Sequence, residues 1–302
     1  MKTAIGTCFR LWLLVGGMVA VRADSLTVAT YNIENYVATN RMTGVGYRKD
    51  YPKPEAEKRA LRAVIRALGA DVLVLQEMGA QPYLDELRRD LKSEGMDYPF
   101  AALAIAADAD RHVALLSRLP LKNVTTHADL QFTYFGAKEA VKRGLLEVTL
   151  ATADGDVTLF GLHLKSRFTE RPDDPGGAIR RAGEATAIRD AVLRRFPTPA
   201  AARFLILGDC NDHRVSKALE HLQQRGKTGI CVLLPAVDAH GETWTHSYRR
   251  EESYTHVDHI LVSPGLRGAV QDGTARIFDG QGVADASDHR PVIVTLRVGS
   301  KK

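Results

Sequence analysis

The sequence predicts an α/β protein in which two β-sheets pack together and helices lie on the outside. Short apolar runs rich in β-formers alternate with amphipathic helical segments, and the second half repeats this rhythm without repeating the sequence. Mixed strands and helices of this kind bury their apolar faces by packing in layers. The chain has 302 residues, 45% of them apolar, which is enough for one large core or two modest ones. Because the motifs run from end to end, we expect one domain.

The first half of the chain begins with a strand over Leu26–Tyr31. A helix over Pro54–Leu68 follows, with apolar side chains along one face and Gly69 at its end. Next come a buried strand over Asp71–Leu75 and a helix over Gln81–Glu94. The middle is rich in strands parted by turn residues, and these strands are Val113–Ser117, Leu145–Leu150 and Val157–His163.

The second half alternates in the same way. A helix over Ala178–Phe196 precedes a strand over Arg203–Leu207, and a helix over Val215–Gln224 follows it. Two further strands are expected over His256–Ser263 and Arg290–Val298. Two loops rich in Gly, Pro or charge have no predicted element, and loops of this kind often border a site; they are Val37–Lys53 and Arg167–Gly177.

The first 23 residues have the layout of a secretory signal peptide. Lys2 and Arg10 precede the apolar run Leu11–Val21, and the segment ends on small residues at Ala23. We expect cleavage after Ala23, which leaves residues 24–302 as the catalytic domain and makes the protein secreted or periplasmic. The alternative is an uncleaved anchor, but a run of about 11 residues falls short of the roughly 20 that span a bilayer.

Loss of this segment changes the charge of the protein. Three basic residues and no acidic ones leave with it, so the formal charge falls from +5 to +2. A charge this small gives little support to nucleic-acid binding, which needs a basic stripe. Two cysteines remain, Cys210 and Cys231. In an oxidising compartment they could form a disulfide or stay as thiols.

Polar side chains gather where the apolar strands end. A single polar residue at a strand end usually caps a turn, but six such strand ends in one chain indicate a functional site. These residues are Asn32, Glu34 and Asn35; Glu77; His163 and Lys165; Asp209, Asn211 and Asp212; Asp258 and His259; and Asp288 and His289. Cys210 alternates with Asp209 and Asn211, so we expect it to point to the opposite face and to be buried.

The residue types suit hydrolysis of a phosphoester. Glu77 and Asp288 are hard oxygen donors of the kind that bind Mg²⁺, Mn²⁺ or Ca²⁺, and no thiol cluster favours zinc. Attack by water on phosphorus also needs a group that orients or deprotonates the water and donors for the phosphate oxygens. His163 and His289 are candidates for proton transfer, and Asp258 could hold His289 in one tautomer.

The set of motifs resembles the endonuclease/exonuclease/phosphatase superfamily, which includes deoxyribonuclease I. YN, LQE, HLKS, GDCND, VDHILVS and SDHRPV occur in the order and rough spacing of that family, from Thr27 to about Val298. The resemblance implies a deoxyribonuclease I-like fold. This is a four-layer α/β sandwich, with two packed mixed β-sheets flanked by helices and the site at one edge of the sheets.

The resemblance also implies a role for each matching residue. The catalytic residues would be His163, Asp209, Asn211, Asp258 and His289. The metal ligands would be Glu77, Asp288 and Glu34, with Mg²⁺ as the expected ion and Mn²⁺ or Ca²⁺ as alternatives. The residues that bind the substrate phosphate would be Asn32, Arg143 and Lys165. The match of Arg143 is the least specific, and a plain surface arginine is the alternative. Whether Asp209 or His289 takes the proton of the water is left open, and His259 is given no role.

Three functions compete on this scaffold. The first is a secreted nuclease, for which a basic rim could form from Lys165, Arg167, Arg180, Arg181, Arg189, Arg194 and Arg195, or these could be a solvated helix face. The second is a sphingomyelinase-like or other lipid or small-molecule phosphoesterase. The aromatic residues of Leu130–Gly136 could stack on bases, touch lipid or pack on the core. The third is an inactive binding protein, which should lack part of the acidic and histidine set. Nothing indicates a stable protein partner, and we expect a monomer.

Overall fold

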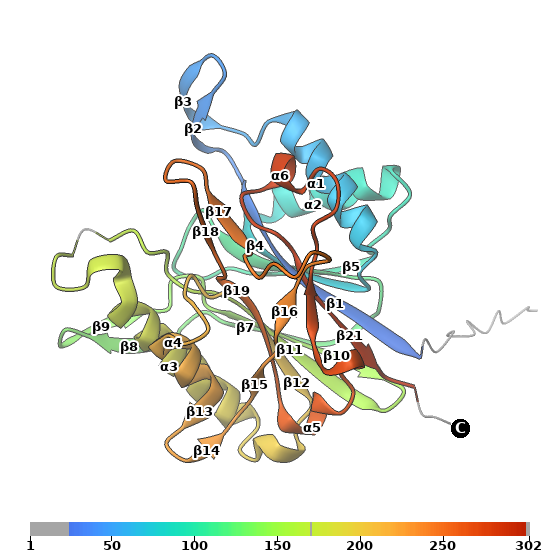
Figure 1. The fold of residues 1–302 in the computed structure, drawn as a ribbon, viewed down its shortest axis with the longest axis vertical. Helices are drawn as coiled ribbons and strands as arrows, with labels where there is room; N and C mark the ends of the chain where they lie inside the picture. Colours follow the sequence, from blue (N-terminus) through green and yellow to red (C-terminus); the bar gives the residue numbers. More distant parts are fainter. Residues whose placement is uncertain (1–23, 170, 300–302) are drawn as a thin grey trace, which may run out of the picture.

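Two β-sheets form the centre of the computed structural model, which describes residues 24–169 and 171–299 (Figure 1). The first sheet has the order β16 (Ala236–Val237), β20 (Ala275–Ile277), β21 (Val292–Arg297), β1 (Ser25–Tyr36), β4 (Val72–Met78), β6 (His112–Ser117) and β5 (Phe100–Ala104). The second has the order β15 (Val232–Leu233), β19 (Asp258–Val262), β12 (Phe204–Asp209), β11 (Gly155–His163), β10 (Leu145–Thr152) and β7 (Leu121–His127). The expected signal peptide lies outside the described residues.

Helices cover the outer faces of both sheets. Apolar side chains of α1 (Glu55–Leu68) and α2 (Gln81–Ser93) pack on the first sheet, and those of α3 (Ala178–Arg195) and α4 (Lys217–Gln223) pack on the second. The short helices are α5 (Pro264–Arg267), α6 (Val283–Ala286), η1 (Pro175–Gly177), η2 (Pro199–Ala201) and η3 (Gln271–Gly273). Within the described residues, no helix has the length and apolar character needed to cross a membrane.

The core consists of three apolar layers, and strand alternation explains them. In β1, Leu26 and Val28 point between the two sheets, while Ala29 and Tyr31 pack against the helix side. The third layer lies between the second sheet and α3 and α4 and includes Phe160. The order helix, sheet, sheet, helix is the four-layer α/β sandwich that the family resemblance implied.

Four hairpins project from the sheets, and one corrects the sequence analysis. They are β2 (Thr39–Thr43) with β3 (Gly46–Tyr51), β8 (Gln131–Tyr134) with β9 (Ala137–Ala140), β13 (Gln224–Arg225) with β14 (Thr228–Gly229), and β17 (His246–Tyr248) with β18 (Ser253–Thr255), all within the described residues. The segment Val37–Lys53 was expected to be a loop, but it contains β2 and β3. Most side chains of this hairpin are exposed, so it lacks the apolar alternation that marks a strand.

The two cysteines remain thiols, so the possible disulfide is not formed. Both are buried in the layer under α3 and α4. Cys210 lies on the opposite face of its segment from Asp209, as predicted. Cys231 Sγ lies 3.2 Å from the backbone oxygen of Leu222. Burial raises the pKa of both thiols.

Candidate active site

Three of the predicted site residues lie side by side on neighbouring strands of the second sheet. The pairing register places His163 on β11 next to Asp209 on β12, and Asp209 next to Asp258 on β19. Leu207 and Ile260, two residues from Asp209 and Asp258, belong to the core between the sheets. Because strand side chains alternate with a period of two, the three polar side chains emerge at the edge of this same core.

Asn32 joins this group from the first sheet. It lies on β1 on the same face as Val28, which also points between the sheets. Its Nδ2 donates to Oδ2 of Asp209 at 3.0 Å. The hydrogen bond therefore connects the two sheets at their shared edge.

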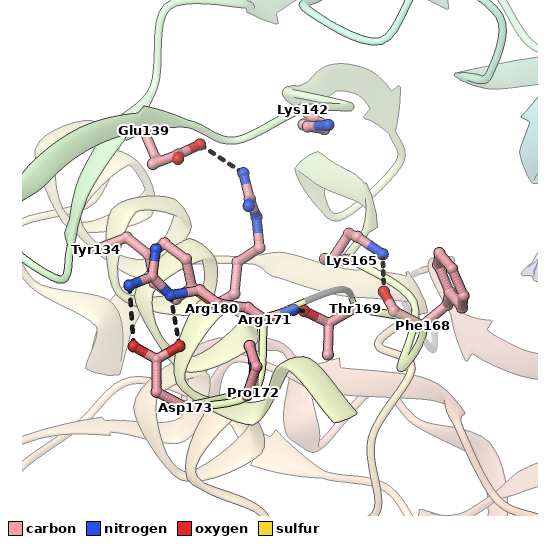
Figure 2. Close-up of a pocket in the computed structure, with 10 residues that line it drawn as sticks. All are labelled: Tyr134, Glu139, Lys142, Lys165, Phe168, Thr169, Arg171, Pro172, Asp173 and Arg180. Carbon is pink, nitrogen blue, oxygen red and sulfur yellow. Dashed lines mark hydrogen bonds and ion pairs between the residues drawn. The ribbon is translucent and has the colours of Figure 1, made fainter. Parts of the chain in front are cut away.

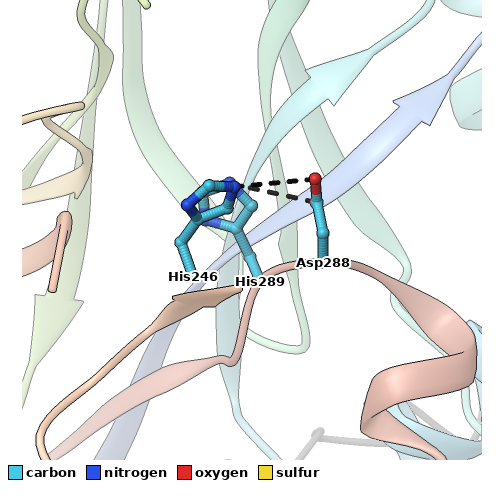
Figure 3. Close-up of side chains that lie close together, drawn as sticks. All are labelled: His246, Asp288 and His289. Atoms are coloured by element: carbon cyan, nitrogen blue, oxygen red, sulfur yellow. Dashed lines mark ion pairs between the residues drawn. The ribbon is translucent and has the colours of Figure 1, made fainter. Parts of the chain in front are cut away.

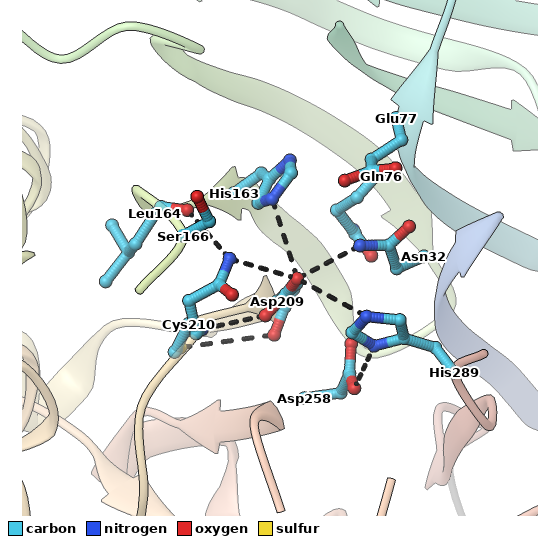
Figure 4. A network of polar contacts seen from close by, with 12 residues as sticks. Asn32, Gln76, Glu77, His163, Leu164, Ser166, Asp209, Cys210, Asp258 and His289 are labelled. Carbon is cyan, nitrogen blue, oxygen red and sulfur yellow. Dashed lines mark hydrogen bonds and ion pairs between the residues drawn. The ribbon is translucent and has the colours of Figure 1, made fainter. Parts of the chain in front are cut away.

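Asp209 is the centre of the polar network (Figure 4). Its side chain is 1% exposed, and Oδ2 accepts hydrogen bonds from Nδ2 of Asn32 at 3.0 Å and Nδ2 of Asn211 at 3.2 Å. Oδ1 accepts from the backbone N–H of Asn211 at 2.7 Å. The Nε2 atoms of His163 and His289 lie 3.5 and 3.9 Å from Oδ2.

His289 is held from two sides. Its Nδ1 lies 2.8 Å from Oδ2 of the buried Asp258, and its backbone N–H donates to Oγ of Ser287. The ring of His246 lies 4.6 Å from the ring of His289, centroid to centroid. Figure 3 shows both rings beside Asp288, whose Oδ2 is 3.8 Å from Nε2 of His246. The Asp258 carboxylate thus lies where it could hold the imidazole in one tautomer, the role that the sequence analysis expected for it.

Burial and neighbouring charges shift three pKa values in this cluster. Burial, followed by the Asp258 carboxylate, raises the pKa of Asp209 to about 7, although His289 opposes the rise. Burial, followed by the charge of Arg143, holds the pKa of His163 well below its usual value. Burial alone would lower the pKa of His289, but the carboxylates of Asp258, Asp209 and Asp288 raise it well above its usual value.

Comparison with models of known protein families shows which family this chain belongs to. The model of the Endonuclease/Exonuclease/phosphatase family matches residues 29–289. The chain belongs to this family. Its members hydrolyse phosphoester bonds, so the protein is a phosphoester hydrolase. A search of curated protein sequences gave no significant match.

Solved structures of other family members share the fold. Sphingomyelinase C from Streptomyces griseocarneus is 20% identical, with a TM-score of 0.61 over 91% of this chain and 100% of that chain. The catalytic domain of human nocturnin, solved with a bound sulfate anion, is 18% identical, with a TM-score of 0.61 over 91% and 94% of the two chains. An endonuclease/exonuclease/phosphatase from Beutenbergia cavernae is 21% identical, with a TM-score of 0.59 over 92% and 72%.

Enzymes of this family generally use a divalent metal, and the acidic side chains here fit one. Glu77 lies on β4, where the preceding residue pairs with Asn32 of β1. Burial, followed by the charge of Asp288, raises the pKa of Glu34, so two carboxylates repel each other near the site. Hard carboxylate oxygens are the donors that Mg²⁺ or Mn²⁺ prefers. Glu34, Glu77 and Asp288 would hold the ion.

The structure also brings a histidine to these acids that the sequence analysis missed. Ligand atoms of His246, Asp288 and His289 lie within 4.8 Å of one another, and this group includes neither Glu34 nor Glu77. His246 follows Thr245 in a stretch without a strong strand pattern. Its place is fixed by pairing with β18 and by a bridge to His289, so the local sequence carries no signal for it.

Strained backbone positions gather at the site. Among the described residues other than glycine, positive φ angles occur at Glu34 (49°), Asn35 (51°), Glu77 (63°) and Asn211 (51°), and at only four positions elsewhere. Such angles are costly for residues with a Cβ and persist where the surrounding structure imposes them. At Glu77 the strain coincides with a register shift between β4 and β6.

The two cations predicted to bind phosphate have different surroundings. Arg143 is buried, pairs with Asp108 at 3.0 Å and lies close enough to lower the pKa of His163, so it is not a plain surface arginine. Lys165 does not contact Asp209. Its Nζ donates to Oγ of Ser166 at 2.8 Å and to the backbone oxygen of Phe168 at 2.5 Å, because the chain turns away after β11.

The arginines of α3, which could have formed a basic rim or a solvated helix face, are mostly paired with acids. Arg181 is 3% exposed and pairs with Asp212 at 3.0 Å, so it is a buried structural residue. The other pairs join arginines to nearby acids, and they are Arg180 with Glu139, Arg189 with Asp190, and Arg195 with Glu147. These contacts explain why the count of arginines overstated the positive charge available to a substrate.

The aromatic segment Leu130–Gly136 packs mainly on the core. Phe132 and Tyr134 are buried in the layer that also contains residues of α3. Phe135 is 46% exposed, and the guanidinium of Arg171 lies 4.1 Å from its ring centroid. The hairpin β8–β9 therefore presents no continuous apolar surface.

Proposed function

We infer that this protein is a secreted, divalent-metal-dependent phosphodiesterase that cleaves nucleic acid. The observation that carries the reaction is the buried Asp209 carboxylate, which lies between His163 and His289 and accepts hydrogen bonds from Asn32 and Asn211. A polar network of this density, at the point where strands of both sheets end, is suited to act on a ligand.

The contacts favour Asp209 as the group that takes the proton of the attacking water. His289 lies between the carboxylates of Asp258 and Asp209, an environment that stabilises its imidazolium form. The water oxygen bonds to phosphorus and its proton passes to Asp209, while the bond from phosphorus to the leaving oxygen breaks and that oxygen takes a proton from His289. The second Nδ2 hydrogen of Asn32 is left to donate to a phosphate oxygen, whereas both Nδ2 hydrogens of Asn211 bond to Asp209 and to the backbone oxygen of Leu164 and so hold the carboxylate in place. A bound divalent ion would supply positive charge for the developing negative charge.

Charge supports nucleic acid as the substrate. Two of the three aromatic side chains that could have met a lipid surface, Phe132 and Tyr134, are buried, whereas Arg143 and Lys165 carry positive charge close enough to His163 to lower its pKa. A phosphodiester backbone is recognised first through its charge. Secretion follows from the expected signal peptide over residues 1–23.

A substrate panel tests this function. Mature protein starting at residue 24 is incubated with plasmid DNA, RNA, sphingomyelin or phosphorylated inositols, each with Mg²⁺ or Mn²⁺ and with or without chelator. We expect cleavage of DNA or RNA that chelator abolishes, and loss of that cleavage in His289→Ala. If all four substrates stay intact, the enzyme function is wrong, and if His289→Ala keeps full activity, the site is wrong.

A second candidate is a lipid phosphoesterase, and one surface feature favours it. The hairpin β2–β3 exposes Met42, Val45 and Tyr47 at 78%, 79% and 56%, and it leaves the first sheet directly after the residues that include Glu34. Exposed apolar side chains beside basic ones suit an interface with anionic lipid. Cleavage of sphingomyelin in vesicles by the wild type would favour this candidate if the double variant Met42→Ser, Tyr47→Ser lost that cleavage. The same double variant should keep its activity on a soluble substrate.

A further inference from the structure

A pocket of about 790 Å³ lies between the β8–β9 hairpin and the segment after β11 (Figure 2). Glu139 and Tyr134 of the hairpin form one wall, and Arg180 of α3 forms another. Lys165, two residues after His163, also lines it, so the segment that forms this wall follows directly in the chain from the end of β11. The reaction proposed above does not use this pocket.

The described residues that line the pocket carry an excess of positive charge. Among them, four side chains are basic and two are acidic, for a formal charge of +2 over these six; they are Lys142, Lys165, Arg171, Arg180, Glu139 and Asp173. Both acids are already engaged, because Glu139 pairs with Arg180 at 2.6 Å and Asp173 with Arg171 at 2.7 Å. Within the described residues, neither lysine forms an ion pair. The two ammonium groups therefore account for the excess charge.

The surrounding residues add to this excess. Burial, followed by the charge of Arg143, lowers the pKa of Lys165 to about 8, and Arg180 and Lys142 act in the same direction. The buried Glu184 opposes them and fixes the segment, because its Oε2 accepts from the backbone N–H of Lys165 at 2.7 Å. Lys142 is exposed. Cations held together in this way favour an anionic ligand.

We propose that this pocket binds the phosphate and base adjacent to the phosphodiester that is cut, with Lys142 and Lys165 neutralising that second phosphate. The proposal rests on the nucleic-acid function above and adds a subsite to it. Lys165 lies close enough to His163 for its charge to lower the pKa of that histidine, so we expect the lysines to meet the next phosphate of a strand whose cut phosphate lies at Asp209.

Size and composition fit a nucleotide. Pockets for small ligands commonly enclose about 300–1,000 Å³, and this one lies in that range. Phe168 at its wall is 74% exposed, and an exposed aromatic ring beside a phosphate site suits a stacked base. A phosphocholine headgroup would bring its quaternary ammonium among these cations and would be repelled.

Dinucleotides with one cleavable bond test the subsite. The mature protein is assayed with Mg²⁺ or Mn²⁺ on a dinucleotide that carries an extra phosphate at its 5′ end, at its 3′ end or at neither. For one of the two ends we expect the extra phosphate to lower KM by about fivefold to tenfold, which corresponds to roughly 1–1.4 kcal/mol. Lys142→Gln should abolish this decrease in KM, which we call the gain. The variant should leave kcat unchanged, and it should also leave unchanged the KM for the dinucleotide without an extra phosphate.

Two matched variants define the effect. Lys138→Gln removes an exposed lysine of the same hairpin that does not line the pocket, and it should keep the full gain. Glu139→Gln frees Arg180 from its pair and should increase the gain. If neither end gives a gain, or if Lys142→Gln keeps it, the subsite is wrong while the nuclease function stands. If no dinucleotide or longer nucleic acid is cleaved, the proposed function itself fails and the subsite with it.

Discussion

At the scale of single residues, one buried carboxylate dominates the account. Asp209 is surrounded by hydrogen-bond donors and lies at the end of β12, yet its side chain is only 1% exposed. The protein therefore keeps an ionisable group in a place where water solvates it poorly. Such a group costs stability when charged and is useful when it must accept a proton. Function and stability therefore oppose each other at this position.

Asp209→Asn should be inactive but more stable above neutral pH. The pKa of Asp209 is about 7 in the folded protein, against about 3.9 in an unfolded chain. The folded state binds the proton more tightly, so the stability contributed by this group is present at low pH and is lost as pH rises from about 4 to about 7. In chelator, we expect the variant to exceed the wild type by about 1 kcal/mol or more at pH 8 and by much less at pH 5.

Urea unfolding at the two pH values measures this difference. The control is Asp129→Asn, because Asp129 is exposed. This variant should change the free energy of unfolding only slightly, and by the same amount at pH 5 and pH 8. Equal stability of Asp209→Asn and wild type at pH 8 would show that the carboxylate is better solvated than its burial indicates.

At the scale of elements, strand alternation explains how much the sequence could predict. In strands such as Leu26–Tyr31 and Val157–His163, apolar residues either alternate with polar ones or follow one another without interruption. Both patterns indicate a strand that packs on the core, so the sequence predicted these strands and the polar residues at their ends. β7 is mostly exposed and β5 is rich in alanine, so neither has that signal. The approach of His246 to Asp288, and the burial of Arg181 against Asp212, depend on tertiary packing that no local pattern encodes.

The turn into the site depends on one glycine of β12. Gly208 has φ of 148°, and a Cβ there would lie 2.0 Å from the backbone oxygen of Leu162 on β11. Gly208→Ala should therefore destabilise the protein by about 3 kcal/mol or more, because the clash is with backbone. Thermal or urea unfolding checks this, with Gly268→Ala, where nothing lies within 4 Å, as the control. Equal stability of both variants would mean that β11 and β12 separate readily.

At the scale of the whole molecule, stability comes from three apolar layers and no covalent bridge among the described residues. Reducing agent should therefore leave the midpoint of thermal unfolding of the mature protein unchanged. Cys210→Ala with Cys231→Ala should lower the midpoint both with and without reductant, because both thiols fill the core. A drop in the wild-type midpoint on reduction alone would reveal a disulfide and contradict the thiols seen here.

The central claim is that Asp209 and its neighbours form a metal-dependent site for phosphodiester hydrolysis. The most direct test is the initial rate of cleavage of supercoiled plasmid DNA by mature wild type and by Asp209→Asn, with Mg²⁺ and with chelator. The account predicts nicking by the wild type only with metal, rising as pH passes through about 7, and a rate lower by about a thousandfold in the variant. Cleavage that survives chelator, or an Asp209→Asn variant as fast as the wild type, would contradict it.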